Sequence, residues 1–276
     1  FFVLSGFVLT PQLLLVESDS KKHIKNFILR RWYRTLPAYF FAIVCAIIIF
    51  DFGSYINLFK FISYTQNFFG DNSNPNFYPV AWSLSVEEWF YILIPLFLLL
   101  FSTLKFRERN KLLFLCIIII IILSISKILA IYHSVDWGEE IRRSVIYRLD
   151  ALCWGIVAFL YKDKIKTLIN LIILITFTSI LIFFFLNLEF LNSNFFAKFI
   201  FFPSCSLSFS SILIFCSNIK IETKLIKNLG KFLANISYSM YLFHIFFITI
   251  FNNKFENILF SLSIYLITLM IFCNLF

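Results

Sequence analysis

The chain has 276 residues, of which 61% are hydrophobic, 21% are aromatic and only 14% are charged. A soluble globule of this length could not bury so much apolar surface, so disordered and soluble classes are excluded and the lipid bilayer is the expected solvent. The formal net charge of +9 would favour nucleic-acid binding in a soluble protein. In a membrane protein the basic loops of the cytoplasmic side account for it, so we expect no nucleic-acid partner.

The six cysteines are widely spaced, lie in apolar runs and form no CxxC pair. Such spacing indicates neither a metal cage nor a disulfide framework. Small buried apolar side chains are the ordinary role of such residues. We therefore expect no metal and no bound cofactor.

Apolar runs of about 20 residues, each suited to cross a bilayer, follow one another along the chain. They predict an all-α, polytopic transmembrane helix bundle with eight spans plus a partial N-terminal one, in a single membrane-embedded domain over residues 1–276. No initiator methionine precedes the first run, so we expect an N-terminally truncated chain. The predicted segments are Phe1–Val16 (partial), Pro37–Phe50 (Trp32–Phe52 with its flank), Val80–Phe101, Leu112–Tyr132, Val145–Tyr161, Leu168–Leu188, Phe196–Ser217, Phe232–Phe251 and Asn257–Phe276.

Lys and Arg residues separate the connections into two alternating sets. Seventeen of the 24 lie in one set, five in the other, and Lys127 and Arg148 lie within spans. By the positive-inside bias, the first set faces the cytoplasm, so we expect a multi-pass membrane protein with a cytoplasmic C-terminus. The long outward connection Asp51–Pro79 mixes amides with aromatics, which suits a sugar acceptor, although an ordinary turn-rich loop has the same composition.

Two adjacent carboxylates, Glu87 and Glu88, stand near the start of a span. Charged side chains are energetically costly at membrane depth, so these two are candidates for a functional role. On a helix, Ser83, Glu87 and Tyr91 share one face, whereas Glu88 points about 100° away. A carboxylate here could act as a base or hold a histidine in place. The alternative is a pair of acids that the dipole favours at a helix N-terminus.

Further polar residues stand at or near membrane depth. Arg30 and Arg34, or Arg31 and Arg34, lie on one helix face and suit phosphate oxygens, or they form an ordinary basic flank. Arg148 and Asp150 face apart, so we expect partners on other helices, while Lys127 is expected to snorkel outward.

The last span carries Ser237, Tyr241 and His244 on one face. A histidine inside an apolar span needs a partner, which a simple interhelical hydrogen bond could also supply. At the other end of the chain, Ser5 and Gly6 allow two helix backbones to approach closely.

These residues, taken together and in order, resemble the membrane acyltransferase-3 family of bacterial O-acetylating enzymes. The resemblance covers nearly the whole chain, and its most specific blocks are FFVLSGF and WSLSVEE. The ordered blocks are Phe1–Phe7, Arg30–Pro37, Trp82–Tyr91 with Pro95, Arg148–Asp150 and Ile236–His244.

The resemblance implies an acyltransferase that moves an acyl group, commonly acetyl, from cytoplasmic acyl-CoA to a hydroxyl of an extracytoplasmic glycan or lipid-linked saccharide. It implies that Arg31 and Arg34 hold the phosphates of the donor and that Ser5 and Gly6 line the acyl path. Glu87, and with it Glu88, would lie at the reacting centre. The candidate substrate-site residues are Trp82, Ser83, Tyr91, Arg148, Asp150, Tyr241 and His244.

Ten core spans are typical of the family, and the first carries an arginine and, some ten residues on, a histidine regarded as catalytic. On this resemblance we expect the present sequence to begin after that span. An inactive remnant of such an enzyme is therefore one alternative. A transporter of a glycan or lipid carrier is another, because proline-broken helices with buried charges also serve transport.

Overall fold

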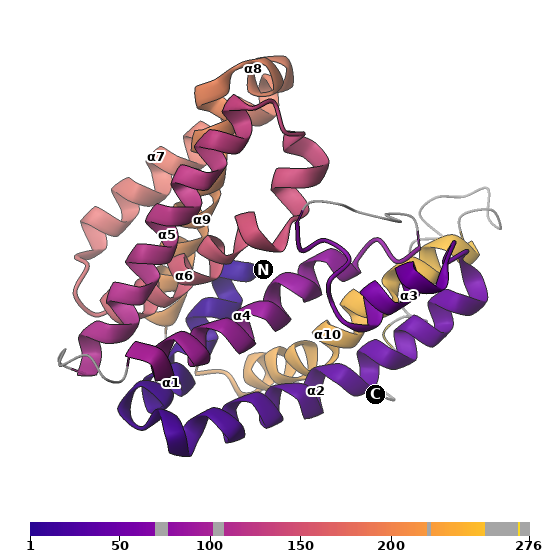
Figure 1. Cartoon of the computed structure of the whole chain (residues 1–276). Helices are drawn as coiled ribbons and strands as arrows, with labels where there is room; N and C mark the ends of the chain where they lie inside the picture. Colours follow the sequence, from indigo (N-terminus) through magenta and orange to yellow (C-terminus); the bar gives the residue numbers. More distant parts are fainter. Residues whose placement is uncertain (70–76, 102–107, 220–221, 252–269, 271–276) are drawn as a thin grey trace. The chain divides into compact units, whose positions relative to one another are not determined.

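The structure is a computed structural model that describes residues 1–69, 77–101, 108–219, 222–251 and 270 (Figure 1). All regular structure in these residues is helical, which confirms the predicted fold class. The elements are α1 (Phe2–Ser18), α2 (Ser20–Ile49), α3 (Tyr55–Ile62), α4 (Ala81–Leu100), α5 (Glu108–Tyr132), the π-helical turn η2 (Trp137–Ile141), α6 (Val145–Tyr161), α7 (Thr167–Leu186), α8 (Leu188–Ser193), α9 (Phe195–Ser217) and α10 (Lys224–Phe251).

Six described helices are long and apolar enough to cross a bilayer: α2, α4, α5, α7, α9 and α10. The predicted span Val145–Tyr161 forms a helix with the expected bounds, but its 17 residues make it shorter than these six. The predicted partial span is the short apolar helix α1. The last predicted span, Asn257–Phe276, lies outside the described residues apart from residue 270.

The second span is longer than the sequence suggested. We predicted its start near Pro37 or Trp32, yet α2 runs without interruption from Ser20 through Pro37 to Ile49. Proline removes one backbone donor, and membrane helices tolerate that loss when neighbouring groups satisfy the backbone. The predicted connections also hold the short helices α3 and α8, and Ser54 caps α3 by accepting a hydrogen bond from the Asn57 amide at 3.2 Å.

Contacts divide the chain into two compact units, which we describe separately. Unit 1 comprises Phe1–Leu29, Asn67–Asn72 and Ser85–Ile219, and unit 2 comprises Arg30–Gln66, Ser73–Leu84 and Lys220–Phe276. The single domain predicted over residues 1–276 stays a prediction.

In unit 1, α6 packs against α1, α5 and α9, and it crosses α1 at two glycines. A Cβ atom at Gly6 would lie 2.0 Å from the Leu152 carbonyl oxygen, and one at Gly155 would lie 2.0 Å from the Val3 carbonyl oxygen. Only hydrogen atoms fit between the two backbones. The close approach predicted for Gly6 is therefore present, and Gly155 is its counterpart on α6.

Replacing Gly6 by alanine is expected to lower the free energy of unfolding by at least about 1–3 kcal/mol, because the methyl group must push two backbones apart. Thermal unfolding in detergent measures the effect. Gly230→Ala in α10 is the matched control, since no atom lies within 4 Å of its added Cβ atom. Alanine there gains about 1 kcal/mol of helix propensity over glycine, so equal destabilisation of both variants would contradict the crossing described here.

Unit 2 has an aromatic core. Tyr39 stacks on Tyr64 with ring centroids 4.3 Å apart and donates a hydrogen bond to the Phe61 carbonyl at 2.8 Å. Tyr78 stacks on Phe246 at 5.6 Å and donates to a backbone carbonyl of α10 at 3.0 Å. Burial raises the pKa of the Tyr78 phenol well above its ordinary value, so the hydroxyl stays protonated and remains a donor.

Candidate active site

Ser5 of α1 and Glu87 of α4 meet in unit 1, although 82 positions separate them in the chain. The Ser5 Oγ donates a hydrogen bond to the Glu87 Oε1. Glu87 is only 5% exposed, and this contact joins the two sequence blocks that carry the strongest resemblance. A buried carboxylate held by a hydroxyl donor keeps a fixed orientation, which a group acting at a reacting centre requires.

The helix-dipole explanation for the two carboxylates does not fit the structure. Helix α4 begins at Ala81, and its first turn contains no acidic residue. Glu87 and Glu88 lie in the second turn, beyond the reach of the terminal dipole, and both side chains are buried. Their burial must therefore be balanced by side chains of other elements.

The three residues predicted to share one face of α4 contact different neighbours: they are Ser83, Glu87 and Tyr91. Ser83, in unit 2, shares a hydrogen bond of 2.5 Å with the Tyr241 hydroxyl. Tyr91, in unit 1, packs edge-on against Phe27 with ring centroids 6.4 Å apart. Trp82, in the first turn of α4, is half-buried.

Asp150 has its partner on another helix, as the sequence predicted. The Lys127 Nζ of α5 lies 2.5 Å from the Asp150 Oδ2, and the two residues are 1% and 2% exposed. The prediction that Lys127 snorkels outward is wrong. Asp150 offers a counter-charge at the same depth, so the ammonium group is paired inside the bundle and is not carried to the interface.

Arg148 also contacts other helices, but through aromatic rings. Its guanidinium carbon lies 4.6 Å from the ring centroid of Phe202 in α9 and 5.6 Å from that of Phe2 in α1. Phe2 and Ser5, the residues of α1 that Arg148 and Glu87 contact, are three positions apart in the chain. A carboxylate, a hydroxyl and a guanidinium thus gather around the start of α1.

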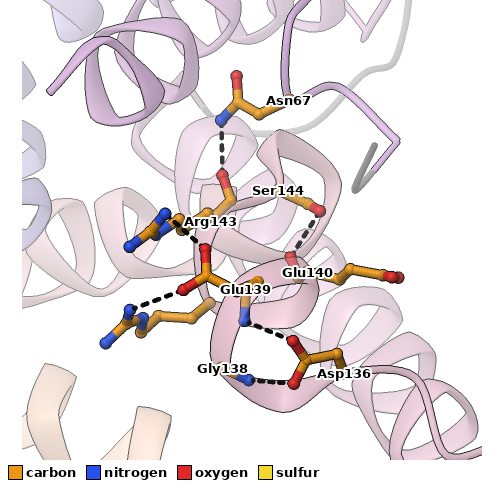
Figure 2. A network of polar contacts seen from close by, with 8 residues as sticks. Asn67, Asp136, Gly138, Glu139, Glu140, Arg143 and Ser144 are labelled. Atoms are coloured by element: carbon orange, nitrogen blue, oxygen red, sulfur yellow. Dashed lines mark hydrogen bonds and ion pairs between the residues drawn. The ribbon is translucent and has the colours of Figure 1, made fainter. Parts of the chain in front are cut away.

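A polar network fixes the start of α6, three residues before Arg148 (Figure 2). The Asn67 Nδ2 donates to the Arg143 carbonyl at 2.6 Å, and the Asn67 carbonyl accepts from the Val145 amide at 3.0 Å. Asp136 caps η2 by accepting from the amides of Gly138 and Glu139. The sequence alone did not predict this network, although Asp136-Trp137-Gly138 is a stretch typical of a turn.

An apolar cavity of about 250 Å³ lies next to this cluster in unit 1. It is lined by side chains of three helices and one loop residue, and all of them are hydrophobic. They include Phe90 and Phe97 of α4, Ile119 of α5, Leu149 of α6, and Phe68.

The candidate residues of the block Ile236–His244 lie in unit 2, as does Ser83. The hydroxyls of Ser83 and Tyr241 both reach the Val80 carbonyl, at 3.3 and 3.0 Å. The His244 Nδ1–H donates to the Tyr241 carbonyl at 2.7 Å, because a carbonyl can only accept. In the neutral ring, the Nε2 of His244 is then the acceptor.

The two arginines of the predicted donor site lie in the part of α2 that belongs to unit 2. Arg34 is exposed and Arg31 is half-buried. The backbone beside them is fixed, since Thr35 donates to the Arg31 carbonyl at 3.0 Å and the Tyr238 hydroxyl donates to the Thr35 carbonyl at 3.0 Å. The roles assigned to all candidate site residues stay predictions.

Comparison with known proteins connects this geometry with a family. A family profile described as an acyltransferase domain, that of acyltransferase-3, matches residues 1–276. The chain belongs to the acyltransferase-3 family. This membership confirms the resemblance drawn from the sequence blocks that meet at Ser5 and Glu87.

Two curated relatives match parts of this acyltransferase domain. The peptidoglycan O-acetyltransferase OatA of Listeria monocytogenes is 33% identical over 130 residues, which are 41% of this chain and 21% of that protein. A Haemophilus influenzae protein is 31% identical over 141 residues, which are 45% of this chain and 56% of that protein. The matches therefore span only part of each relative, about a fifth and about half. No solved structure matches the chain significantly.

Proposed function

We propose that the protein transfers an acyl group, in the simplest case acetyl, from cytoplasmic acyl-CoA to a hydroxyl of an extracytoplasmic glycan. Family membership supports the reaction class, and the name of the Listeria relative supports a glycan acceptor. The single observation that carries the proposal is the hydrogen bond from Ser5 to the buried Glu87, which joins the two most specific sequence blocks. The host membrane would be the bacterial inner membrane, with the C-terminus in the cytoplasm.

The reaction forms one bond and breaks another. The acceptor oxygen attacks the thioester carbonyl, the new C–O bond forms, and the C–S bond breaks to release the CoA thiol. The proton of the acceptor hydroxyl passes to a base and then to the leaving sulfur. In this scheme Glu87 stabilises the positive charge of the protonated base, and Arg148 faces the negative charge that develops on the carbonyl oxygen.

The donor would bind at Arg31 and Arg34. Guanidinium groups suit phosphate oxygens, and the exposed Arg34 and half-buried Arg31 stand one helical turn apart on α2.

The proposal is tested by measuring acyl transfer by the protein expressed from its own complete gene. The purified protein is reconstituted in liposomes with radiolabelled acetyl-CoA on one side and a peptidoglycan fragment on the other. Labelled ester in the glycan, absent in empty liposomes, is the expected result. A glycan that stays unlabelled while other acceptors are acylated would refute the acceptor, and no transfer to any hydroxyl would refute the function.

The proposed orientation predicts which residues an impermeant thiol reagent reaches on intact cells. In a background with the six native cysteines replaced, Phe69→Cys should be labelled, because Phe69 is exposed and lies in the outward connection. Lys164→Cys is the matched control: it is exposed in the connection after α6, and it should be labelled only after the cells are opened. The reverse pattern would overturn the orientation.

A further inference from the structure

Within unit 2, helices α2 and α10 run side by side in the same direction (Figure 1). The Tyr238 hydroxyl of α10 donates to the Thr35 carbonyl of α2 at 3.0 Å, and the ring centroids of Phe243 and Phe41 lie 5.8 Å apart. Both chains advance from the first contact to the second, so the two helices are parallel. The contact between Tyr238 and Thr35 therefore shows which parts of the two helices stand at the same level.

The two arginines of the candidate donor site stand close to this contact on α2. Arg31 precedes Thr35 by four residues, about 6 Å along the helix axis, and lies on the same face. The Thr35 hydroxyl donates to the Arg31 carbonyl at 3.0 Å, which fixes the backbone between them. Arg34 directly precedes Thr35 and is exposed.

Two lysines lie on the face of α10 that contacts α2. Lys231 precedes Tyr238 by seven residues and Lys227 precedes it by eleven, and both spacings return to the same side of a helix. At about 1.5 Å per residue, Lys231 stands about 10 Å and Lys227 about 16 Å from Tyr238 towards the start of α10. Both lysines are exposed, so a ligand can reach their ammonium groups.

Four cations from two helices thus follow one another along unit 2. With increasing distance from the contact between the helices their order is Arg34, Arg31, Lys231 and Lys227. Neither α2 nor α10 contains an acidic residue within its bounds, so the helices themselves supply no carboxylate to neutralise this basic row. Like charges gathered along one line favour a ligand that carries several negative charges.

Acyl-CoA carries its negative charge at two separate places. The pyrophosphate lies nearer the thioester, and a single phosphate on the 3′ position of the ribose lies farther from it. In the proposed orientation the starts of α2 and α10 face the cytoplasm, and the thioester enters first. The order of the phosphates along the donor then matches the order of the cations, with the arginines deeper and the lysines nearer the cytoplasm.

We infer that Lys231, together with Lys227, binds the ribose 3′-phosphate of the donor, while Arg31 and Arg34 hold its pyrophosphate. This inference rests on the proposed function. The guanidinium forks suit the adjacent phosphates of a pyrophosphate, and an ammonium group suits a single phosphate as a point charge. Helix α10 is then the second wall of the donor site, and it selects CoA over 3′-dephospho-CoA.

The test measures equilibrium binding of CoA and of 3′-dephospho-CoA to the full protein in lipid nanodiscs. Wild-type protein should bind CoA at least about tenfold more tightly, the lower end of the range for a hydrogen bond to a charged group. In Lys227→Gln/Lys231→Gln the Kd of CoA should rise by about the same factor, while the Kd of 3′-dephospho-CoA should change less than about twofold.

Three further variants show that the effect belongs to this row. Lys164→Gln, exposed in the connection after α6, is the matched control and should leave both Kd values unchanged. Lys231→Arg keeps the charge and should keep the preference for CoA. Arg34→Ala should weaken the binding of both ligands, because both carry the pyrophosphate. Gel filtration and thermal unfolding establish that each variant is folded.

The outcomes separate this inference from the function on which it rests. Equal affinity of the wild-type protein for the two ligands, or an equal loss of both in the double lysine variant, overturns the inference, and acyl transfer by the same protein leaves the function standing. A wild-type protein that binds neither ligand and transfers no acyl group overturns the proposed function and this inference with it.

Discussion

Acyl transfer is expected to fall by about 10²–10⁴-fold in Glu87→Gln, with the amount of folded protein near that of wild type. Glutamine keeps the size of the side chain and can still accept the hydrogen bond from Ser5, but it carries no charge. The charge is what would stabilise a protonated base while the acceptor hydroxyl loses its proton. The measurement is kcat at saturating acetyl-CoA, normalised to folded protein.

Glu88→Gln is the matched control because Glu88 is equally buried and adjacent but points to another side of α4. It should impair folding or expression at least as much as turnover. Ser5→Ala, which removes the donor to Glu87 without changing charge, should lower kcat less than Glu87→Gln does. Full turnover in Glu87→Gln would mean that the carboxylate is a packing element and has no part in catalysis.

Binding of acetyl-CoA is expected to weaken by about 1.5–3 kcal/mol in Arg34→Ala, the range for a hydrogen bond to a charged group. That loss corresponds to about a 10–150-fold rise in Kd. The reason is loss of a guanidinium from the face of α2 that Arg31 and Arg34 share. Equilibrium binding of a non-hydrolysable acyl-CoA analogue to the reconstituted protein measures the change separately from turnover.

Arg31→Ala should weaken the same binding, whereas Lys25→Ala is the control. Lys25 is exposed like Arg34 and precedes it by nine residues on α2, so it faces the opposite side of the helix. An equal loss in all three variants would indicate a diffuse basic surface without a built site. An unchanged Kd in both Arg31→Ala and Arg34→Ala would remove the donor site from α2 altogether.

The sequence predicted best those features that follow from the free-energy cost of placing charged or unpaired polar groups in a bilayer. Charges are rare in apolar segments, so Glu87, Arg148 and Asp150 stand out in the sequence alone, and Asp150 does have its partner on another helix. The helical fold class followed from the same cost, because membrane backbones must satisfy their own hydrogen bonds.

What the sequence could not supply were the partners. Nothing in the spacing places Lys127 opposite Asp150, Gly155 opposite Gly6, or Ser5 opposite Glu87, because helix neighbours depend on packing between segments far apart in the chain. Proline was expected to mark the start of a span, but α2 continues through Pro37. The connection before α4 was predicted only from its composition, which does not reveal the hydrogen bond from Asn67 to the Arg143 carbonyl.

The glycine crossing of α1 and α6 has a mechanical consequence. Two backbones separated only by hydrogen atoms act as a pivot: the helices can rock about Gly6 and Gly155, but neither can slide along the other by a turn without driving a side chain into a carbonyl. Ser5 is adjacent to this pivot on α1, and Arg148 lies about two turns from it on α6. Rocking at this crossing would therefore shift the Arg148 guanidinium more than the Ser5 hydroxyl, while the register of the two helices is kept.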